Sequence, residues 1–280
     1  MKSINLGDMR ELPEPQFMVW ITSDDPLTLG GKTVKRYQIA WDTDDEILDD
    51  WALHIRRHYL RDDELARRCA GRQASPAEYL KKNVIPQRED QNGPQIIAGD
   101  FAEILVMDIA RFLMDYVVPR YKHHNRKIKT ASEQGSDVLA YKFVGSPSVP
   151  SSDDQMQVVE VKSAVSERKA SGVEDRIASA ATGSARDRSR YSMTLEYMID
   201  EAIDAKDDMT RDELLRFQDK GEHPFDERFG IAVTMDSKVA FEDGLSLEDS
   251  AADDINGLVI IVRAEEFKKL VYDIYSRCTS

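Results

Sequence analysis

The sequence predicts an α/β fold of the α+β kind, in which helices flank a mixed central sheet. Three observations support this prediction. Strand-like segments open the chain, a long apolar helical segment begins at Gly99, and two further strand-like segments follow it around a turn-rich loop. We expect an N-terminal α+β subdomain over residues 1–95 and a core over residues 96–280, because residues 86–95 are polar and rich in turn formers.

The N-terminal part is expected to contain two strands and then helices. Residues 16–22 and 33–41 have strand-like composition, with a turn over the intervening DDPLTLGG. Residues 44–60 carry apolar side chains at helical spacing. The segment 75–83 begins with Ser75, which is a good N-cap, and continues with a proline and a glutamate three residues after the cap.

The core is expected to begin with a buried helix, because residues 99–118 are apolar nearly all round. Residues 135–144 and 156–163 then predict two strands, and the glycine, prolines and serines between them indicate a hairpin loop. The remaining expected elements are a helix over 187–204, strands at 229–236 and 256–263, and a final helix over 264–278.

The composition of the 280 residues, 41% of them hydrophobic, is that of a globular protein with ample core. No apolar run approaches the eighteen or so residues that cross a bilayer, and the first residues lack the apolar stretch of a signal peptide. We therefore expect a cytoplasmic location without a membrane partner. Cys69 and Cys278 lie far apart, which argues against a disulfide framework or a structural zinc site.

The net charge of −14 disfavours nucleic acid, but the charge is unevenly distributed. Acidic residues gather at 200–213 and 242–254, which we interpret as solvated helix ends or loops. Residues 120–129, in contrast, contain five lysines and arginines and no acid. This segment is either a solvated connecting loop or a surface that contacts phosphates. The candidate DNA-binding residues are Arg120, Lys122, Arg126, Lys127, Lys129, Arg186, Arg188 and Arg190.

A candidate site arises from the predicted hairpin. Glu160 and Lys162 point to one face of their strand, since side chains alternate along a strand. In an antiparallel pair the early part of the first strand lies beside the late part of the second, so Asp137 comes close to both. Two carboxylates are costly to bury together, and Mg²⁺ between them would remove their repulsion.

The predicted buried helix supplies a fourth residue. Asp108, Arg111 and Asp115 fall on one stripe that can face solvent and pair internally. Glu103 lies on another stripe, among apolar neighbours. An acid in such a position usually has a partner, and the metal or the lysine of the sheet is the nearest candidate.

These residues together resemble the PD-(D/E)XK nuclease superfamily. Glu103 on a helix, Asp137 on a strand, a hairpin, and Glu160-Val161-Lys162 on the next strand follow the order of that superfamily. The resemblance covers residues 99–163 and implies a restriction-endonuclease-like core. Ser136 stands where the superfamily pattern has a proline.

A closer resemblance is to the HamA family, the nuclease subunits of the Hachiman antiphage defence system. It rests on GDFAE at 99–103, GSD at 135–137, VEVKS at 159–163 and the non-catalytic N-terminal part. The family implies metal-dependent DNA cleavage, restrained until a HamB-like helicase partner detects abnormal DNA. In this hypothesis Asp137 and Glu160 ligate Mg²⁺, for which Mn²⁺ substitutes. Glu103 completes the shell or binds a second ion, and Lys162 positions the attacking water.

Structural alternatives stand beside each assignment. Glu160 and Lys162 could form an ordinary salt bridge on a half-exposed sheet, Asp137 could cap a turn, and Glu103 could pair with a nearby arginine. His54 and His58 have the i, i+4 spacing of two zinc ligands, but no third ligand is evident from the sequence, so a packed or solvated pair is favoured.

The remaining basic residues are ambiguous. His123 and His124 belong to the basic segment and could assist phosphate binding or do nothing. Arg186, Arg188 and Arg190 are expected at the start of the helix after the E-x-K strand, close to DNA or simply as charged surface. Two rival functions also remain open: a non-cleaving module that binds nucleic acid or protein on the same fold, and a nuclease that acts on RNA.

Overall fold

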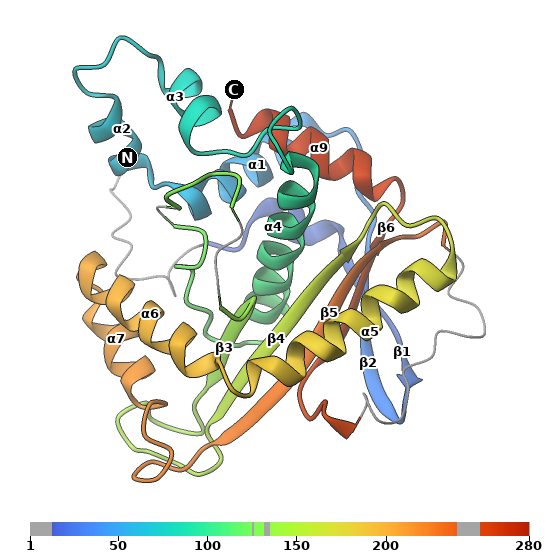
Figure 1. The fold of residues 1–280 in the computed structure, drawn as a ribbon, viewed down its shortest axis with the longest axis vertical. Helices are drawn as coiled ribbons and strands as arrows, with labels where there is room; N and C mark the ends of the chain where they lie inside the picture. Colours follow the sequence, from blue (N-terminus) through green and yellow to red (C-terminus); the bar gives the residue numbers. More distant parts are fainter. Residues whose placement is uncertain (1–12, 125, 132–134, 240–252, 280) are drawn as a thin grey trace.

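A single six-stranded sheet forms the centre of the molecule (Figure 1). The computed structural model describes residues 13–124, 126–131, 135–239 and 253–279. The strand order is β1-β2-β6-β5-β4-β3, with parallel pairing from β2 to β4 and an antiparallel pair at each edge. The predicted mixed sheet is therefore confirmed. Its strands are β1 (Ile21–Leu29), β2 (Lys32–Ile39), β3 (Val138–Lys142), β4 (Gln155–Ala164), β5 (Asp226–Asp236) and β6 (Val259–Ala264).

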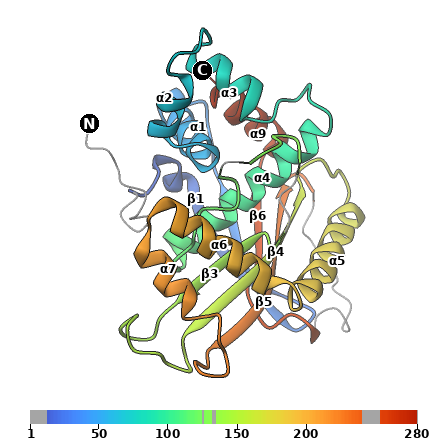
Figure 2. The same ribbon diagram turned by 60° about the vertical axis from the view of Figure 1, so that its left-hand side comes forward.

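Helices cover both faces of the sheet (Figures 1 and 2). On one face, α1, α4 and α9 share a hydrophobic cluster with the sheet. On the other face, α5 packs over β4 and β5, while α6 and α7 pack beside the outer strands. The helices are α1 (Asp45–Tyr59), α2 (Asp62–Cys69), α3 (Pro76–Asn83), α4 (Gly93–Asp108), α5 (Ala170–Asp187), α6 (Tyr191–Ala205), α7 (Asp208–Leu215) and α9 (Phe267–Arg277).

The expected N-terminal part and the core share this sheet and one of its hydrophobic clusters. β2 pairs in parallel with β6, so the first hairpin extends the sheet at one edge. The ring of Trp51 on α1 lies 5.3 Å from that of Phe101 on α4, which in turn lies 5.9 Å from Phe267 on α9. Aromatic packing therefore joins α1, α4 and α9 across the expected boundary at residue 95.

The helices predicted over residues 44–60 and 75–83 are confirmed as α1 and α3. Asp44 caps α1 by accepting hydrogen bonds from the amides of Glu46 and Ile47. Ser75 and Glu78 form the expected capping box at the start of α3. Both cysteines are free. No helix in the described ranges is both long and apolar enough to cross a membrane. Residues 242–252 of the predicted acidic loop lie outside the described residues.

The predicted first strand is wrong over most of its length. Gln16–Trp20 form a short 3₁₀ helix, in which Phe17 and Met18 are both buried while Val19 is 74% exposed, and β1 begins at Ile21. The predicted turn is also too long. β1 continues through most of it with a bulge between Asp24 and Leu27, and the reversal is confined to Gly30-Gly31, which both have positive φ.

The helix predictions in the core need two corrections. The helix predicted over 99–118 begins earlier, at Gly93, and ends at Asp108, after which Ile109–Leu113 form a π-helical turn. The helix predicted to start at 187 is α6, and α5 precedes it over 170–187. The sequence did not predict α5, because its alanines, serines and glycines form only a weak apolar stripe.

Candidate functional site

The β3–β4 hairpin places Asp137 beside the strand that carries Glu160 and Lys162. Val138 pairs with Val159 in the antiparallel register, so Asp137 lies beside the late part of β4, as predicted. One carboxylate oxygen of Asp137 accepts a hydrogen bond of 2.8 Å from the backbone N–H of Val161. This bond fixes Asp137 against the strand that carries Glu160 and Lys162.

Glu160 and Lys162 are paired on one face of β4. The Lys162 ammonium donates to the Glu160 carboxylate at 2.5 Å. Val159 and Val161, on the other face, pack into the cluster that contains α4. Glu160 is buried beneath α5, where a Cβ built on Gly183 would lie 2.4 Å from its carboxyl carbon. Glycine at this position therefore lets the helix lie directly on the carboxylate.

Lys122 connects the remaining predicted site residues. Its ammonium lies 2.8 Å from the Glu103 carboxylate and 2.7 Å from that of Asp137. Its side chain is only 4% exposed. Glu103 thus has a lysine partner, but that lysine comes from the segment before β3 rather than from the sheet. Lys122 was predicted on a DNA-binding surface, and its burial between two acids shows that this prediction is wrong.

A second ion pair holds the segment that carries Lys122. Arg126 donates to both oxygens of Asp100, at 2.7 and 2.9 Å, in the two-pronged geometry that arginine favours. The Tyr59 hydroxyl also donates to Asp100, at 2.6 Å. Asp100 lies one helical turn before Glu103, so this pair fastens the segment to α4 close to the site. Sequence reasoning missed this pair, since the sequence alone does not show that the basic segment folds back onto α4.

The three acids Glu103, Asp137 and Glu160 share only two lysines, Lys122 and Lys162, and the pKa values of the acids reflect this. Burial raises the pKa of Glu103 to about 8, and burial together with the charge of Asp137 raises the pKa of Glu160 to about 7. Burial would also raise the pKa of Asp137, but the ammonium groups of Lys122 and Lys162 together with the hydrogen bond from the Val161 amide outweigh burial and hold this pKa below its usual value. Two carboxyl groups therefore tend to retain protons near neutral pH.

The donor set fits a hard divalent cation in type and in charge. Carboxylates and the backbone carbonyls of β4 are oxygen ligands of the kind that Mg²⁺ prefers. Glu103, Asp137 and Glu160 do not by themselves form a converged triad. Within the described part of the chain, the group of three acids or histidines whose ligand atoms lie within 4.8 Å of one another is His54, His58 and Asp108.

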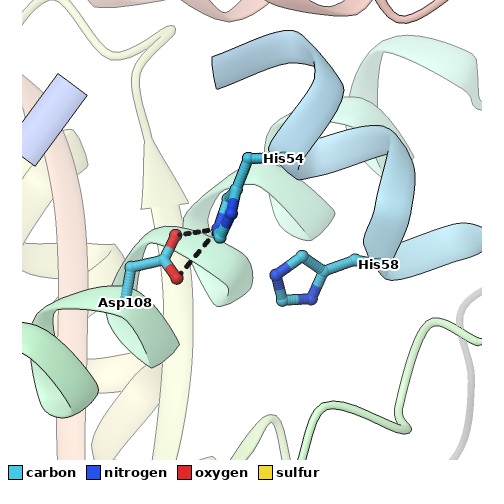
Figure 3. Close-up of side chains that lie close together, drawn as sticks. All are labelled: His54, His58 and Asp108. Carbon is cyan, nitrogen blue, oxygen red and sulfur yellow. Dashed lines mark hydrogen bonds and ion pairs between the residues drawn. The ribbon is translucent and has the colours of Figure 1, made fainter. Parts of the chain in front are cut away.

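The acid of this histidine group, Asp108, is already paired with an arginine, Arg120. The His54 ring nitrogen lies 3.0 Å from both oxygens of Asp108. Figure 3 draws these two contacts as dashed lines. Arg120 reaches the same carboxylate at 2.6 Å and lies 3.0 Å from the ring nitrogen of His58. A guanidinium therefore stands where a metal would have to bind. The cluster joins α1 and α4 to the segment before β3, so the packed-pair interpretation of the histidines is favoured.

The solvent-facing position predicted for Asp108 is wrong. It was expected on a solvent-facing stripe with Arg111 and Asp115, but it is fully buried. The α-helix ends at this residue, and the π-helical turn that follows shifts the later side chains around the axis. The sequence also offered no sign that Asp108 lies against the histidine pair.

The predicted DNA-binding residues fall into two groups. Arg120, Lys122 and Arg126 have buried side chains paired with acids, so the prediction of a basic surface there is wrong. The Lys129 ammonium lies 2.6 Å from Asp90. The remaining candidates are exposed: Lys127, Arg186, Arg188 and Arg190. The three arginines lie where α5 meets α6, rather than at the start of the first helix after β4. Contact of these exposed residues with DNA stays a prediction.

Two comparisons with known proteins bear on the identity of the chain. No curated protein matches it. The model of the HamA family, in contrast, matches residues 15–278, which are nearly the whole chain and include every residue of the cluster described above. The chain therefore belongs to the HamA family.

Proposed function

We propose that this protein is a metal-dependent nuclease that hydrolyses phosphodiester bonds of DNA. One observation carries the proposal: the fold gathers Glu103, Asp137, Glu160 and Lys162 from three separate elements into one buried, acid-rich cluster. A charged group of this kind is costly to hold in a protein interior without a functional reason. The order of these residues along the chain also resembles the PD-(D/E)XK superfamily.

Asp137 and Glu160 would hold Mg²⁺, with the Val161 carbonyl as a further ligand and with Mn²⁺ as a substitute. Glu103, which shares Lys122 with Asp137, would complete the acidic shell. When bound, the ion would lower the pKa of a water and neutralise charge on the scissile phosphate.

Lys162 would act on the phosphate. Its side chain is 28% exposed, which makes it the more accessible of the two lysines in the cluster. An ammonium here can donate to the attacking water and to a non-bridging oxygen of the pentacovalent phosphate, whose extra negative charge it would stabilise. Lys122, at 4% exposure, would instead neutralise Glu103 and Asp137.

We further propose that the protein is the effector of a Hachiman antiphage defence complex and acts beside a HamB-like helicase. Membership of the HamA family supports this part of the proposal. The charge balance supports it too. The net charge is −14, and three of the predicted DNA-binding cations are buried against acids, which weakens the attraction of the chain for phosphates. A partner would supply the grip on DNA, and an acidic surface suits docking on a basic protein.

The test is a cleavage assay on plasmid DNA, linear DNA and RNA, with the purified chain alone and with the helicase. We expect DNA cleavage that requires Mg²⁺ and the helicase, and that Asp137→Asn abolishes. Exposed Asp175→Asn is the matched control and should cut at the wild-type rate. Cleavage of RNA alone would move the proposal to a ribonuclease. Metal-independent DNA binding without any cleavage would favour a binding module.

A further inference from the structure

Asp187, the last residue of α5, is a buried acid that lacks sufficient partners. It is 0% exposed. One of its oxygens lies 3.3 Å from the exposed Arg190, which is a long and weak contact. The other oxygen has no hydrogen-bond partner among the residues that the structure describes. A buried carboxylate oxygen without a partner is costly, so this position calls for a ligand.

The inner face of α5 directs Asp187 toward the site. Gly183 lies four residues earlier, so the two positions share one face of the helix. Gly183 is the residue whose added Cβ would meet Glu160 at 2.4 Å, which shows that this face lies against the Glu160 carboxylate. Asp187 therefore lies one turn further along the same contact. Its charge also helps to raise the pKa of Glu160, so the two acids are within electrostatic reach.

A second unpartnered atom lies on the same face. Ser184 precedes Asp187 by three residues, is 1% exposed, and its hydroxyl oxygen has no hydrogen-bond partner within the described ranges. Two buried polar groups on one helical turn, both without sufficient partners, indicate a place that a polar ligand or ion fills.

The charges around this place specify the ligand class. The carboxylates of Glu103, Asp137 and Glu160 contact the ammonium groups of Lys122 and Lys162, and Asp187 lies within electrostatic reach of this cluster. Among the described residues, no three of these carboxylates have ligand atoms that all lie within 4.8 Å of one another. When all four carboxyl groups are ionised, their negative charge exceeds the charge of the two ammonium groups by two, and only the exposed Arg190 stands beside Asp187. A divalent cation supplies the missing charge, and oxygen donors select a hard ion such as Mg²⁺ or Mn²⁺.

We propose that Asp187 is a further cation-binding carboxylate of this site, which acts with Asp137 and Glu160 from the α5 side of the sheet. The inference rests on the proposed metal dependence and extends the donor set to a residue outside the helix–hairpin pattern. It also gives a reason for an acid at the end of α5, one turn after the small residues Gly183 and Ser184. Gly183 lets α5 lie close to β4, and Asp187 would then bind the same ion as Glu160 of that strand.

The test measures Mn²⁺ binding directly, by the loss of the free-ion signal in electron paramagnetic resonance. The variants are Asp187→Asn and, as the matched control on the exposed side of the same helix, Asp175→Asn. We expect Asp187→Asn to weaken Mn²⁺ binding at least about tenfold, as the loss of one charged ligand would. Asp175→Asn should bind as the wild type does.

Thermal unfolding separates a ligand from a structural acid. If Asp187 binds the ion, Asp187→Asn should keep the melting temperature measured in a chelator, since it removes an unpaired buried charge, and should lose the rise that Mn²⁺ causes. A lower melting temperature in the chelator together with wild-type Mn²⁺ affinity would show a structural acid and overturn the inference.

The same titration distinguishes this inference from the proposed function. If Asp187→Asn weakens Mn²⁺ binding but Asp137→Asn and Glu160→Gln do not, Asp187 is a ligand of a different site and the proposed nuclease centre fails. If Asp137→Asn and Glu160→Gln weaken binding but Asp187→Asn does not, the nuclease proposal stands and the inference fails. A wild-type chain that binds no Mn²⁺ would reject both.

Discussion

Replacing Gly183 by alanine should damage the site far more than the fold. Gly183 lies on α5 directly over Glu160, the proposed ligand on β4. A Cβ added there would lie 2.4 Å from the Glu160 carboxyl carbon and from one of its oxygens. The alanine methyl and the carboxylate cannot occupy these positions together, so the carboxylate or the helix must move.

The size of the effect follows from these distances. Ordinary van der Waals contact begins at 3.4 Å, so the 2.4 Å approach requires a displacement of about 1 Å. Overpacking of this kind costs about 1–3 kcal/mol, offset by up to about 1 kcal/mol because alanine favours the helix. A displacement of about 1 Å at a reacting centre can cost on the order of 100-fold in rate. We therefore expect a net loss of about 0–2 kcal/mol in the free energy of unfolding and roughly a 100-fold loss of cleavage.

The assay pairs urea unfolding with plasmid cleavage in the presence of Mg²⁺ and the helicase. Gly172→Ala on the same helix is the matched control. Its Cβ would also lie 2.4 Å from a carboxylate oxygen, that of Glu167, whose side chain is 30% exposed and can turn into solvent. Gly172→Ala should leave cleavage unchanged and keep or slightly raise the stability.

Two results would refute this reasoning. If Gly183→Ala cleaves at the wild-type rate with wild-type metal affinity, the position of the Glu160 carboxylate under α5 does not matter for the chemistry. If Gly183→Ala and Gly172→Ala lose activity and stability to the same extent, the effect belongs to the helix and not to the site.

Two further predictions follow from the charges. Lys122→Met should lower the free energy of unfolding by about 3 kcal/mol in urea titrations, because it leaves Glu103 and Asp137 buried together without a cation. The control Lys127→Met, at an exposed lysine, should change this free energy by less than about 0.5 kcal/mol. Equal losses in the two variants would contradict the burial of Lys122. The pKa values of Glu103 and Glu160, raised from 4.5 to about 8 and about 7, give a stability contribution that is full below pH 4.5 and is lost as the pH rises through 7 and 8. Metal must displace these protons, so Mn²⁺ affinity should increase from pH 6 to pH 9 with proton release in calorimetry; a pH-independent affinity would contradict the shifts.

The strands and capped helices could be predicted because their signals are local. β2, α1 and α3 follow from alternation, helical spacing and a capping box over fewer than twenty residues each. The hairpin geometry of Asp137 beside β4 followed for the same reason, since antiparallel pairing across one loop fixes the register.

The partners of the site residues could not be predicted, because they depend on tertiary folding. Lys122 was assigned to a basic surface on local composition alone, and no local signal shows that the segment folds back onto α4. Asp108 was assigned to solvent on a helical wheel that assumed a continuous α-helix, whereas the helix changes pitch at that residue. Both errors concern charged side chains that are buried with a partner distant in the sequence.

Asp187 shows a different limit of sequence reasoning. It lies in a stretch of arginines, serines and small residues that has the composition of a solvated helix end. Its burial depends on α5, a helix whose glycine and alanines give little amphipathic signal but allow close packing on β4. Small residues that fit a helix against a sheet leave the weakest pattern in a sequence.

Cleavage of supercoiled plasmid by the wild-type chain and by Lys162→Ala, each with the helicase and Mg²⁺, tests the central claim most directly. Lys162 is partly exposed, and its removal leaves the buried acid Glu160, whose pKa of about 7 lets it take up a proton, so the variant should fold and bind the helicase as the wild type does. We predict that the wild type converts the plasmid to cut products, that a chelator stops it, and that Lys162→Ala leaves the plasmid intact. Cutting by a folded Lys162→Ala at the wild-type rate would contradict the assignment of this cluster as the catalytic centre.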